Sequence, residues 1–161
     1  MQHKLKELFH DFANKVNAMN NTIAMTAITL LKKNLNALND NEKADLIAKL
    51  ADDFKKSKEA YQQSVHIYKK IIKDLESHGG IFGAIENLDN IMDIIDNAGN
   101  NNGKFYQDII EYEPGKDFDS FIKKILNEAL EFDKHMSLIA CELDKIKDLL
   151  RTKGLYPEKN S

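Results

Sequence analysis

Residues 5–30 read LKELFHDFANKVNAMNNTIAMTAITL, and the spacing of their apolar side chains decides the fold. Apolar residues recur at alternating intervals of four and three, which is the period of one face of an α-helix. Residues 1–78 contain neither glycine nor proline, so this part of the chain is expected to form long helices. We predict a first helix over about 3–37. Its inward stripe consists of Leu5, Phe9, Phe12, Val16, Met19, Ile23, Thr26 and Leu30.

A second helix is predicted over about 42–77. Asn41 or Asp40 is expected to cap its start, and the Gly79-Gly80 pair is expected to stop it. Serines and tyrosines alternate in the middle of its stripe, which predicts a close-packed but partly polar seam. The stripe consists of Ile47, Leu50, Phe54, Ser57, Tyr61, Ser64, Tyr68, Ile71 and Leu75.

A third helix is predicted over about 81–97, and the Asn/Gly-rich segment 98–103 is expected to break it before a short helix at 104–113. Pro114 and Gly115 are expected to turn the chain. Asp117 or Asp119 is expected to cap a fourth helix that reaches about residue 151. Its stripe consists of Ile122, Ile125, Ala129, Phe132, Met136, Ile139, Leu143, Ile146 and Leu150.

These helices have similar lengths, each of the order of 50 Å at 1.5 Å per residue. Four rods of matched length with short connections predict an all-α fold, an up-down-up-down bundle of long antiparallel helices with a broken third helix. We expect one domain over 1–152 and a polar C-terminal tail over 153–161.

The composition restricts the possible partners and the compartment. The chain has 161 residues, 42% hydrophobic and 30% charged, and a net charge of -3 with both signs mixed along it. Nucleic acid is not an expected partner, because phosphate binding needs a clustered basic surface. No apolar run reaches the roughly 20 residues that cross a bilayer, and no signal-peptide core is apparent, so no membrane association is expected. Cys141 is the only cysteine, which favours a reducing, cytoplasmic location.

One short segment of the first helix carries a functional signal. His10, Asp11, Asn14, Lys15 and Val16 match, in register, the pattern of histidine, acidic residue, two variable positions, asparagine, lysine and aliphatic residue. This pattern resembles the H-box of sensor histidine kinases and histidine phosphotransferases. The resemblance covers residues 1–77 only, as a helical hairpin, and no ATP-binding domain accompanies it. It implies two-component signal transduction, with a histidine phosphotransfer protein rather than an autokinase.

The resemblance also implies roles for individual residues. His10 would accept and pass a phosphoryl group, Asp11 would hydrogen-bond its ring, and Asn14 would position a water or the partner's phosphoryl group. Lys15 could neutralise phosphate charge. The partner would be the receiver domain of a response regulator, which carries the Mg²⁺ of the reaction. No cofactor or metal is expected on this chain, and homodimerisation is left open.

The helical wheel supports an open position for His10 independently of the resemblance. His10 falls opposite the apolar stripe, and Asn14, Asn17 and Asn21 follow it at helical spacing. The polar half of this face is expected to be open to a docking partner, which Asn17 and Asn21 would contact. The second half of the same face is apolar and is expected to pack against another helix. Its residues are Ala24, Ile28, Leu31, Leu35 and Leu38.

Two alternatives remain open at this stage. The first is a non-enzymatic helical adaptor or regulatory domain that acts through protein–protein interaction. The second is an Mg²⁺-dependent all-α nucleotide pyrophosphohydrolase, in which an acidic stripe on the third helix and a Glu-x-x-Glu pair on the fourth would hold the ion. Its candidate residues are Glu86, Asp89, Asp93 and Asp96 with Glu128 and Glu131.

Overall fold

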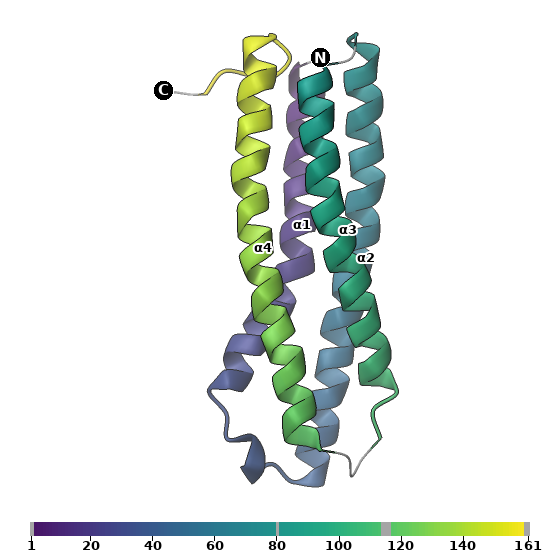
Figure 1. Cartoon of the computed structure of the whole chain (residues 1–161), viewed down its shortest axis with the longest axis vertical. Helices are drawn as coiled ribbons and strands as arrows, with labels where there is room; N and C mark the ends of the chain where they lie inside the picture. Colours follow the sequence, from purple (N-terminus) through teal and green to yellow (C-terminus); the bar gives the residue numbers. More distant parts are fainter. Residues whose placement is uncertain (1, 80, 114–116, 160–161) are drawn as a thin grey trace.

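The chain folds into a bundle of four long helices, which confirms the predicted all-α class (Figure 1). The computed structural model describes residues 2–79, 81–113 and 117–159. Its elements are α1 (Gln2–Leu31), the short 3-10 helix η1 (Leu35–Ala37), α2 (Asp40–Ser77), α3 (Phe82–Ile110) and α4 (Phe118–Thr152). Within the described ranges, every helix is too short or too polar to cross a membrane.

Successive helices run in opposite directions. Figure 1 places the α1–α2 and α3–α4 connections at one end of the bundle, which we call the loop end. Both chain termini and the α2–α3 connection lie at the other end, the terminal end. α1 packs against α2 and α4, and α3 packs against the same two helices. Each helix therefore has two packed sides and one outer side that is left for solvent or a partner.

Side chains and glycines set the helix ends. Asn39 caps α2, because its side chain accepts a hydrogen bond from the Glu42 amide (2.8 Å) while Glu42 accepts one from the Asn39 amide (3.1 Å). The cap is thus one or two residues earlier than predicted. Asp117 caps α4, as predicted. Gly79 has a left-handed φ of 86° where α2 ends. The predicted turn residues Pro114 and Gly115 lie outside the described residues, as does Gly80.

The core follows the predicted apolar stripes. All eight predicted stripe residues of α1 and all nine of α4 are buried. The buried side chains form two clusters, one in the terminal half around Phe9 and Phe12 and one in the loop half around Phe54 and Phe118. The stripes therefore fix which side of each helix faces inward, and with it which residues face out.

A polar layer separates the two apolar clusters, in agreement with the predicted partly polar seam. Ser57 is fully buried and donates to the Met19 carbonyl oxygen (2.7 Å). The buried Asn102 side chain of α3 donates in turn to the Ser57 hydroxyl (3.2 Å). One helical turn toward the loop end, the Thr26 hydroxyl donates to the buried Asp53 carboxylate. Hydrogen bonds thus compensate the burial of these polar groups.

The end of α1 differs from the prediction in two ways. The helix stops at Leu31 rather than near residue 37, and an Asn34-capped turn of 3-10 helix follows. The expectation that the apolar half of its outer face packs against another helix is wrong for Ile28, which is 47% exposed, and Leu31, which is 59% exposed, whereas Leu35 and Leu38 pack in the loop-half cluster. Both neighbours of α1 lie on its other sides, so no helix is available to cover this face.

The predicted break in the third helix is also wrong. α3 is continuous through 98–103, including Gly99 and Gly103. A Cβ atom on Gly99 would lie 2.8 Å from ring atoms of Tyr61, so glycine lets α2 and α3 approach closely here. The burial of Ala98 and Asn102 adds tertiary packing to this segment. Packing therefore outweighs the low intrinsic helix propensity of glycine and asparagine.

The expected polar tail packs against the bundle over its described residues, 153–159. The Tyr156 side chain is 7% exposed and meets the Phe9 ring edge-on, with centroids 5.9 Å apart. The Arg151 guanidinium lies over the Tyr156 ring, and its Nε donates to the Pro157 carbonyl oxygen (2.8 Å). The segment is thus part of the fold rather than an extension from it.

Candidate functional site

The outer face of α1 carries the predicted phosphoacceptor. The fully buried Phe9 and Phe12 anchor the opposite face of the same helical turn in the core, which forces His10 outward. The His10 and Asn14 side chains are both exposed. One helical turn separates them along the same face, and the Asn14 side-chain amide lies 3.3 Å from Nε2 of His10.

This contact is compatible with a nucleophilic imidazole. The Asn14 amide can donate to Nε2 of His10 when that nitrogen carries the lone pair. The proton of the neutral ring is then on Nδ1. A neutral imidazole with an accessible lone pair is a competent nucleophile, and a solvent-exposed ring can be reached by a large partner.

Asp11 lies beside His10 in the sequence but does not contact its ring in the structure. Its carboxylate is exposed, and within the described part of the chain it makes no hydrogen bond to His10. Consecutive side chains on an α-helix point about 100° apart, so neighbours do not face each other. The only described group bonded to the ring is the Asn14 amide.

Lys15 lies on a different side of α1 from Asn17 and Asn21. Lys15 is half-buried in a groove with α2 beside Glu59 and His66, away from the His10 face. Asn17 is exposed and lines the groove toward α4. Asn21 is exposed and continues the face of His10 and Asn14. The structure therefore groups His10, Asn14, Asn17 and Asn21 on the outer side, with Asn17 toward α4, and places Lys15 elsewhere.

No protein-family model, curated protein or solved structure matches this chain.

Two features of this face were not singled out in the sequence. Asn20 is buried, and its side-chain amide donates to Asp133 of α4 (2.6 Å), which fixes the rotation of α1 next to its outer face. Beyond Asn21, the outer side becomes an exposed apolar surface formed by Met25, Ile28 and Leu31. The helical wheel placed Ile28 and Leu31 on this face, but their exposure depends on which sides of α1 have neighbours.

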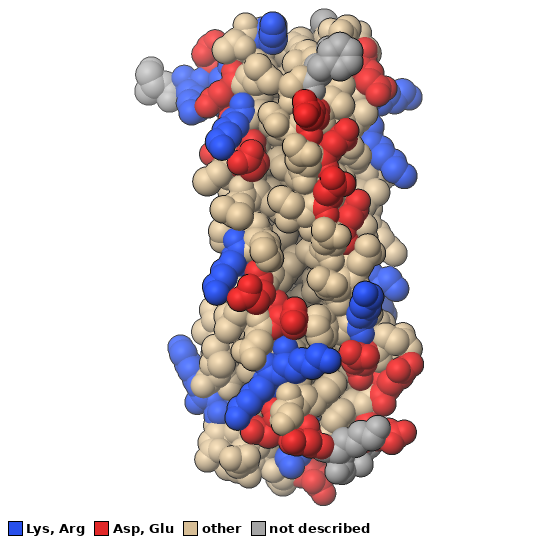
Figure 2. Space-filling model, viewed as in Figure 1, with Lys and Arg blue, Asp and Glu red and all other residues tan. Residues whose placement is uncertain are grey.

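The acidic stripe of α3 has partners on α2. The Tyr61 hydroxyl donates to Asp96 (2.6 Å), and the Tyr68 hydroxyl donates to Asp89. Burial, followed by the hydrogen bond to Asp96, raises the pKa of Tyr61 to about 12. Burial and then Asp89 raise the pKa of Tyr68 as well. Figure 2 shows carboxylates following α3 in the terminal half of the bundle. Two carboxylates of this stripe, those of Asp89 and Asp96, thus accept hydrogen bonds that link α3 to α2.

The Glu-x-x-Glu pair of α4 lies in different surroundings. Glu128 and Glu131 border a hollow of about 280 Å³ between α3 and α4, together with His135 and the amide side chains of Asn97 and Asn101. Figure 2 shows this face hollowed near its middle. No group of three His, Cys, Asp or Glu side chains in the described ranges is arranged to hold a metal ion.

Proposed function

We propose that this chain is a histidine phosphotransfer protein in which His10 accepts and passes a phosphoryl group. The observation that carries the proposal is the exposed His10 ring, whose Nε2 accepts from Asn14 on a side of α1 that no other helix covers. A protein donor must bring a carboxyl phosphate to the ring nitrogen, and only an uncovered helix face permits that approach.

The transfer requires only groups present on His10 and on the donor. The Asn14 amide swings away, and the Nε2 lone pair attacks the phosphorus of an aspartyl phosphate. A nitrogen–phosphorus bond forms while the bond between phosphorus and the aspartate oxygen breaks, and its electron pair stays on the carboxylate. The proton on Nδ1 is then released to water. The displaced Asn14 amide donates to a phosphoryl oxygen, and passing the group onward reverses these steps.

The partner in this proposal is the receiver domain of a response regulator. In this proposal it supplies the aspartate and the Mg²⁺ that neutralises the transferred phosphate. The proposed reaction takes place in the cytoplasm. Lys15 has no direct part in it, because its side chain lies in the α1–α2 groove.

The decisive experiment is phosphate transfer from a panel of receiver domains carrying radiolabelled phosphate. The wild-type chain is expected to take up label that is lost in acid and kept in base, as for phosphohistidine. The His10→Gln variant is expected to take up none. His66→Gln is the matched control, because His66 is an exposed helical histidine on α2 with no role in the proposal.

The outcome separates the relay from the adaptor function. Absence of label from every donor, or equal loss of label in His66→Gln and His10→Gln, would reject phosphotransfer. One observation would then favour an adaptor, namely the apolar surface of α1 on which Met25 is 65% and Leu31 is 59% exposed. Exposed apolar side chains that lie together are typical of protein-binding surfaces.

A further inference from the structure

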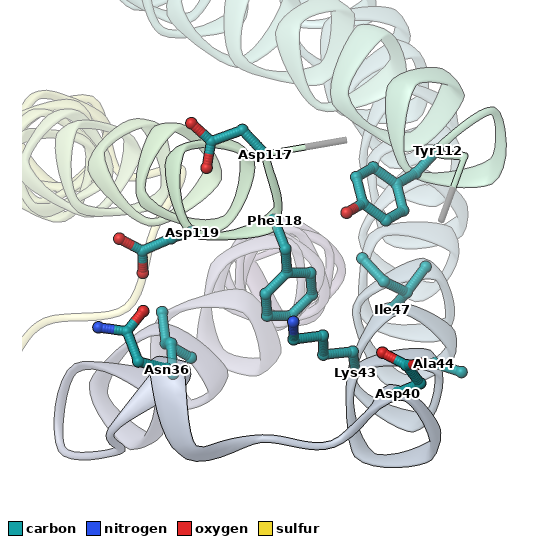
Figure 3. Close-up of a pocket in the computed structure, with 10 residues that line it drawn as sticks. Asn36, Asp40, Lys43, Ala44, Ile47, Tyr112, Asp117, Phe118 and Asp119 are labelled. Atoms are coloured by element: carbon teal, nitrogen blue, oxygen red, sulfur yellow. The ribbon is translucent and has the colours of Figure 1, made fainter. Parts of the chain in front are cut away.

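A separate pocket lies at the loop end of the bundle, far along the molecule from His10. Its volume is about 780 Å³, which falls within the usual range for small-molecule sites. It is enclosed by η1, by the first turns of α2 and α4, and by Tyr112, which lies two residues after the end of α3 (Figure 3). The lining residues on which the following argument depends are Leu35, Asp40, Lys43, Ile47, Tyr112 and Phe118.

Two aromatic rings form a fixed wall of the pocket. Tyr112 and Phe118 meet edge to face, with centroids 6.2 Å apart and planes at 64°. Tyr112 also stacks on Phe121, with centroids 4.6 Å apart. Phe118 is 7% exposed and belongs to the apolar cluster of the loop half. The wall is therefore preorganised, and its ring orientations do not depend on a ligand.

The chain already places a cation against this wall. The Lys43 ammonium lies 5.3 Å from the centroid of the Phe118 ring, within the distance at which an aromatic face attracts a cation. Figure 3 shows the Lys43 side chain in front of the Phe118 ring. Lys43 is only half-buried, so it can be displaced toward solvent. This internal contact shows which kind of group the wall accepts.

The charges around the pocket favour a cation over an anion. The lining carries three carboxylates, those of Asp40, Asp117 and Asp119, and the ammonium of Lys43, and Asp119 is also paired with Lys123 (3.0 Å). Hydrogen bonds from Ser120 lower the pKa of Asp117, which keeps that carboxyl ionised. Figure 3 shows carboxylates of α2 and α4 on two sides of the aromatic wall. Carboxylates still outnumber ammonium groups around the pocket by one, which disfavours a ligand carboxylate or phosphate.

We propose that this pocket binds an amphipathic ammonium compound, with its cationic head on the Phe118 and Tyr112 rings and its apolar chain along Leu35 and Ile47. The head takes the place of the Lys43 ammonium, which moves out to solvent. The carboxylates beside the rings balance its charge. Quaternary and alkylated ammonium groups are the cations that aromatic walls bind best, because they lose little hydration.

Octyltrimethylammonium is the probe, and octanoate is the matched compound with a similar apolar chain and opposite charge. Isothermal titration of the full chain below the micelle concentration of each is expected to show one site. The cation should bind at least tenfold more tightly than octanoate. In amide NMR spectra, the shifts caused by the cation should centre on residues 40–47 rather than on Met25, Ile28 and Leu31.

Three variants test the assigned contacts. Lys43→Met should bind the cation several-fold more tightly, because the competing ammonium is gone, whereas Lys32→Met removes the same charge outside the pocket and should leave affinity nearly unchanged. Tyr112→Leu keeps an apolar side chain and should weaken binding several-fold. Asp40→Asn, at an exposed position at the start of α2, should weaken it too.

Equal or tighter binding of octanoate would overturn the proposal, as would absence of binding to the wild type or shifts centred on the α1 surface. An unchanged or weaker affinity in Lys43→Met would equally overturn it. None of these outcomes bears on His10, because the pocket shares no residue with the phosphotransfer site.

Discussion

Of the two polar residues near His10, Asn14 and Asp11, only Asn14 contacts the imidazole ring. The Asn14 amide contacts Nε2 directly, whereas the Asp11 carboxylate points to another side of the helix. A group that touches the reacting nitrogen can respond to the incoming phosphoryl group, and a group that does not touch it acts only through the local field.

Substitution of these two residues should therefore have unequal effects on phosphotransfer. Asn14→Ala is expected to slow label uptake about tenfold, the equivalent of one hydrogen bond worth about 1.4 kcal/mol. Asp11→Asn should change the rate by less than about twofold, as an exposed charge does. Rates from a single phosphorylated receiver would check this. A larger loss in Asp11→Asn than in Asn14→Ala would show that the resemblance describes Asp11 better than the contacts do.

The tyrosine–aspartate pairs between α2 and α3 should make stability fall at alkaline pH. The pKa of Tyr61 is raised to about 12 in the folded chain, first by burial and then by Asp96. Folding therefore favours the protonated phenol, so its contribution is complete below the unfolded pKa of about 10 and is lost as pH rises toward 12. Urea unfolding from pH 9 to 11 should show this loss, and Tyr61→Phe should reduce its slope. Equal slopes in both proteins would contradict the assignment.

At the scale of the element, the sequence predicted inward faces well and interruptions poorly. The stripes of α1 and α4 follow from helical periodicity, and for the same reason His10 could be placed on the outer side before any coordinates were known. The break at 98–103 was predicted from local propensity, but the close contact of Gly99 with Tyr61 depends on a residue 38 positions away. Likewise, the exposure of Ile28 depends on where α2 and α4 lie around α1.

The two glycines of α3 should respond in opposite ways to alanine. Gly103→Ala is expected to raise the free energy of unfolding by about 0.5–1 kcal/mol, because a Cβ there meets no atom within 4 Å and alanine favours the helix. Gly99→Ala should lower it by about 1–3 kcal/mol, because its Cβ would press on the Tyr61 ring. Urea denaturation of the two variants would check this. Stabilisation by Gly99→Ala would mean that α2 and α3 are not in close contact at this level.

At the scale of the whole molecule, the polar layer divides the bundle into two halves with different proposed roles. His10 lies in the terminal half and the ammonium pocket at the loop end, and each has its own apolar cluster beneath it. The layer between them contains Ser57 and Asn102, which bond to each other and, through Ser57, to the Met19 carbonyl of α1. Three helices are thus held in register at one level, and removal of the Ser57 hydroxyl alone would leave the buried Asn102 amide without its acceptor.

A double-mutant cycle at this layer should reveal the coupling. Ser57→Ala is expected to lower the free energy of unfolding by about 1–3 kcal/mol, since the buried Asn102 amide loses its acceptor. Asn102→Leu should cost less, because the Ser57 hydroxyl keeps its bond to the Met19 carbonyl. The double variant removes both polar groups and joins the two apolar clusters. The free energy of unfolding that it loses should therefore be smaller than the sum of the two single losses, by about 1 kcal/mol or more. Strictly additive effects in urea denaturation would show that the two side chains stabilise the bundle independently, and that the layer does not act as one unit.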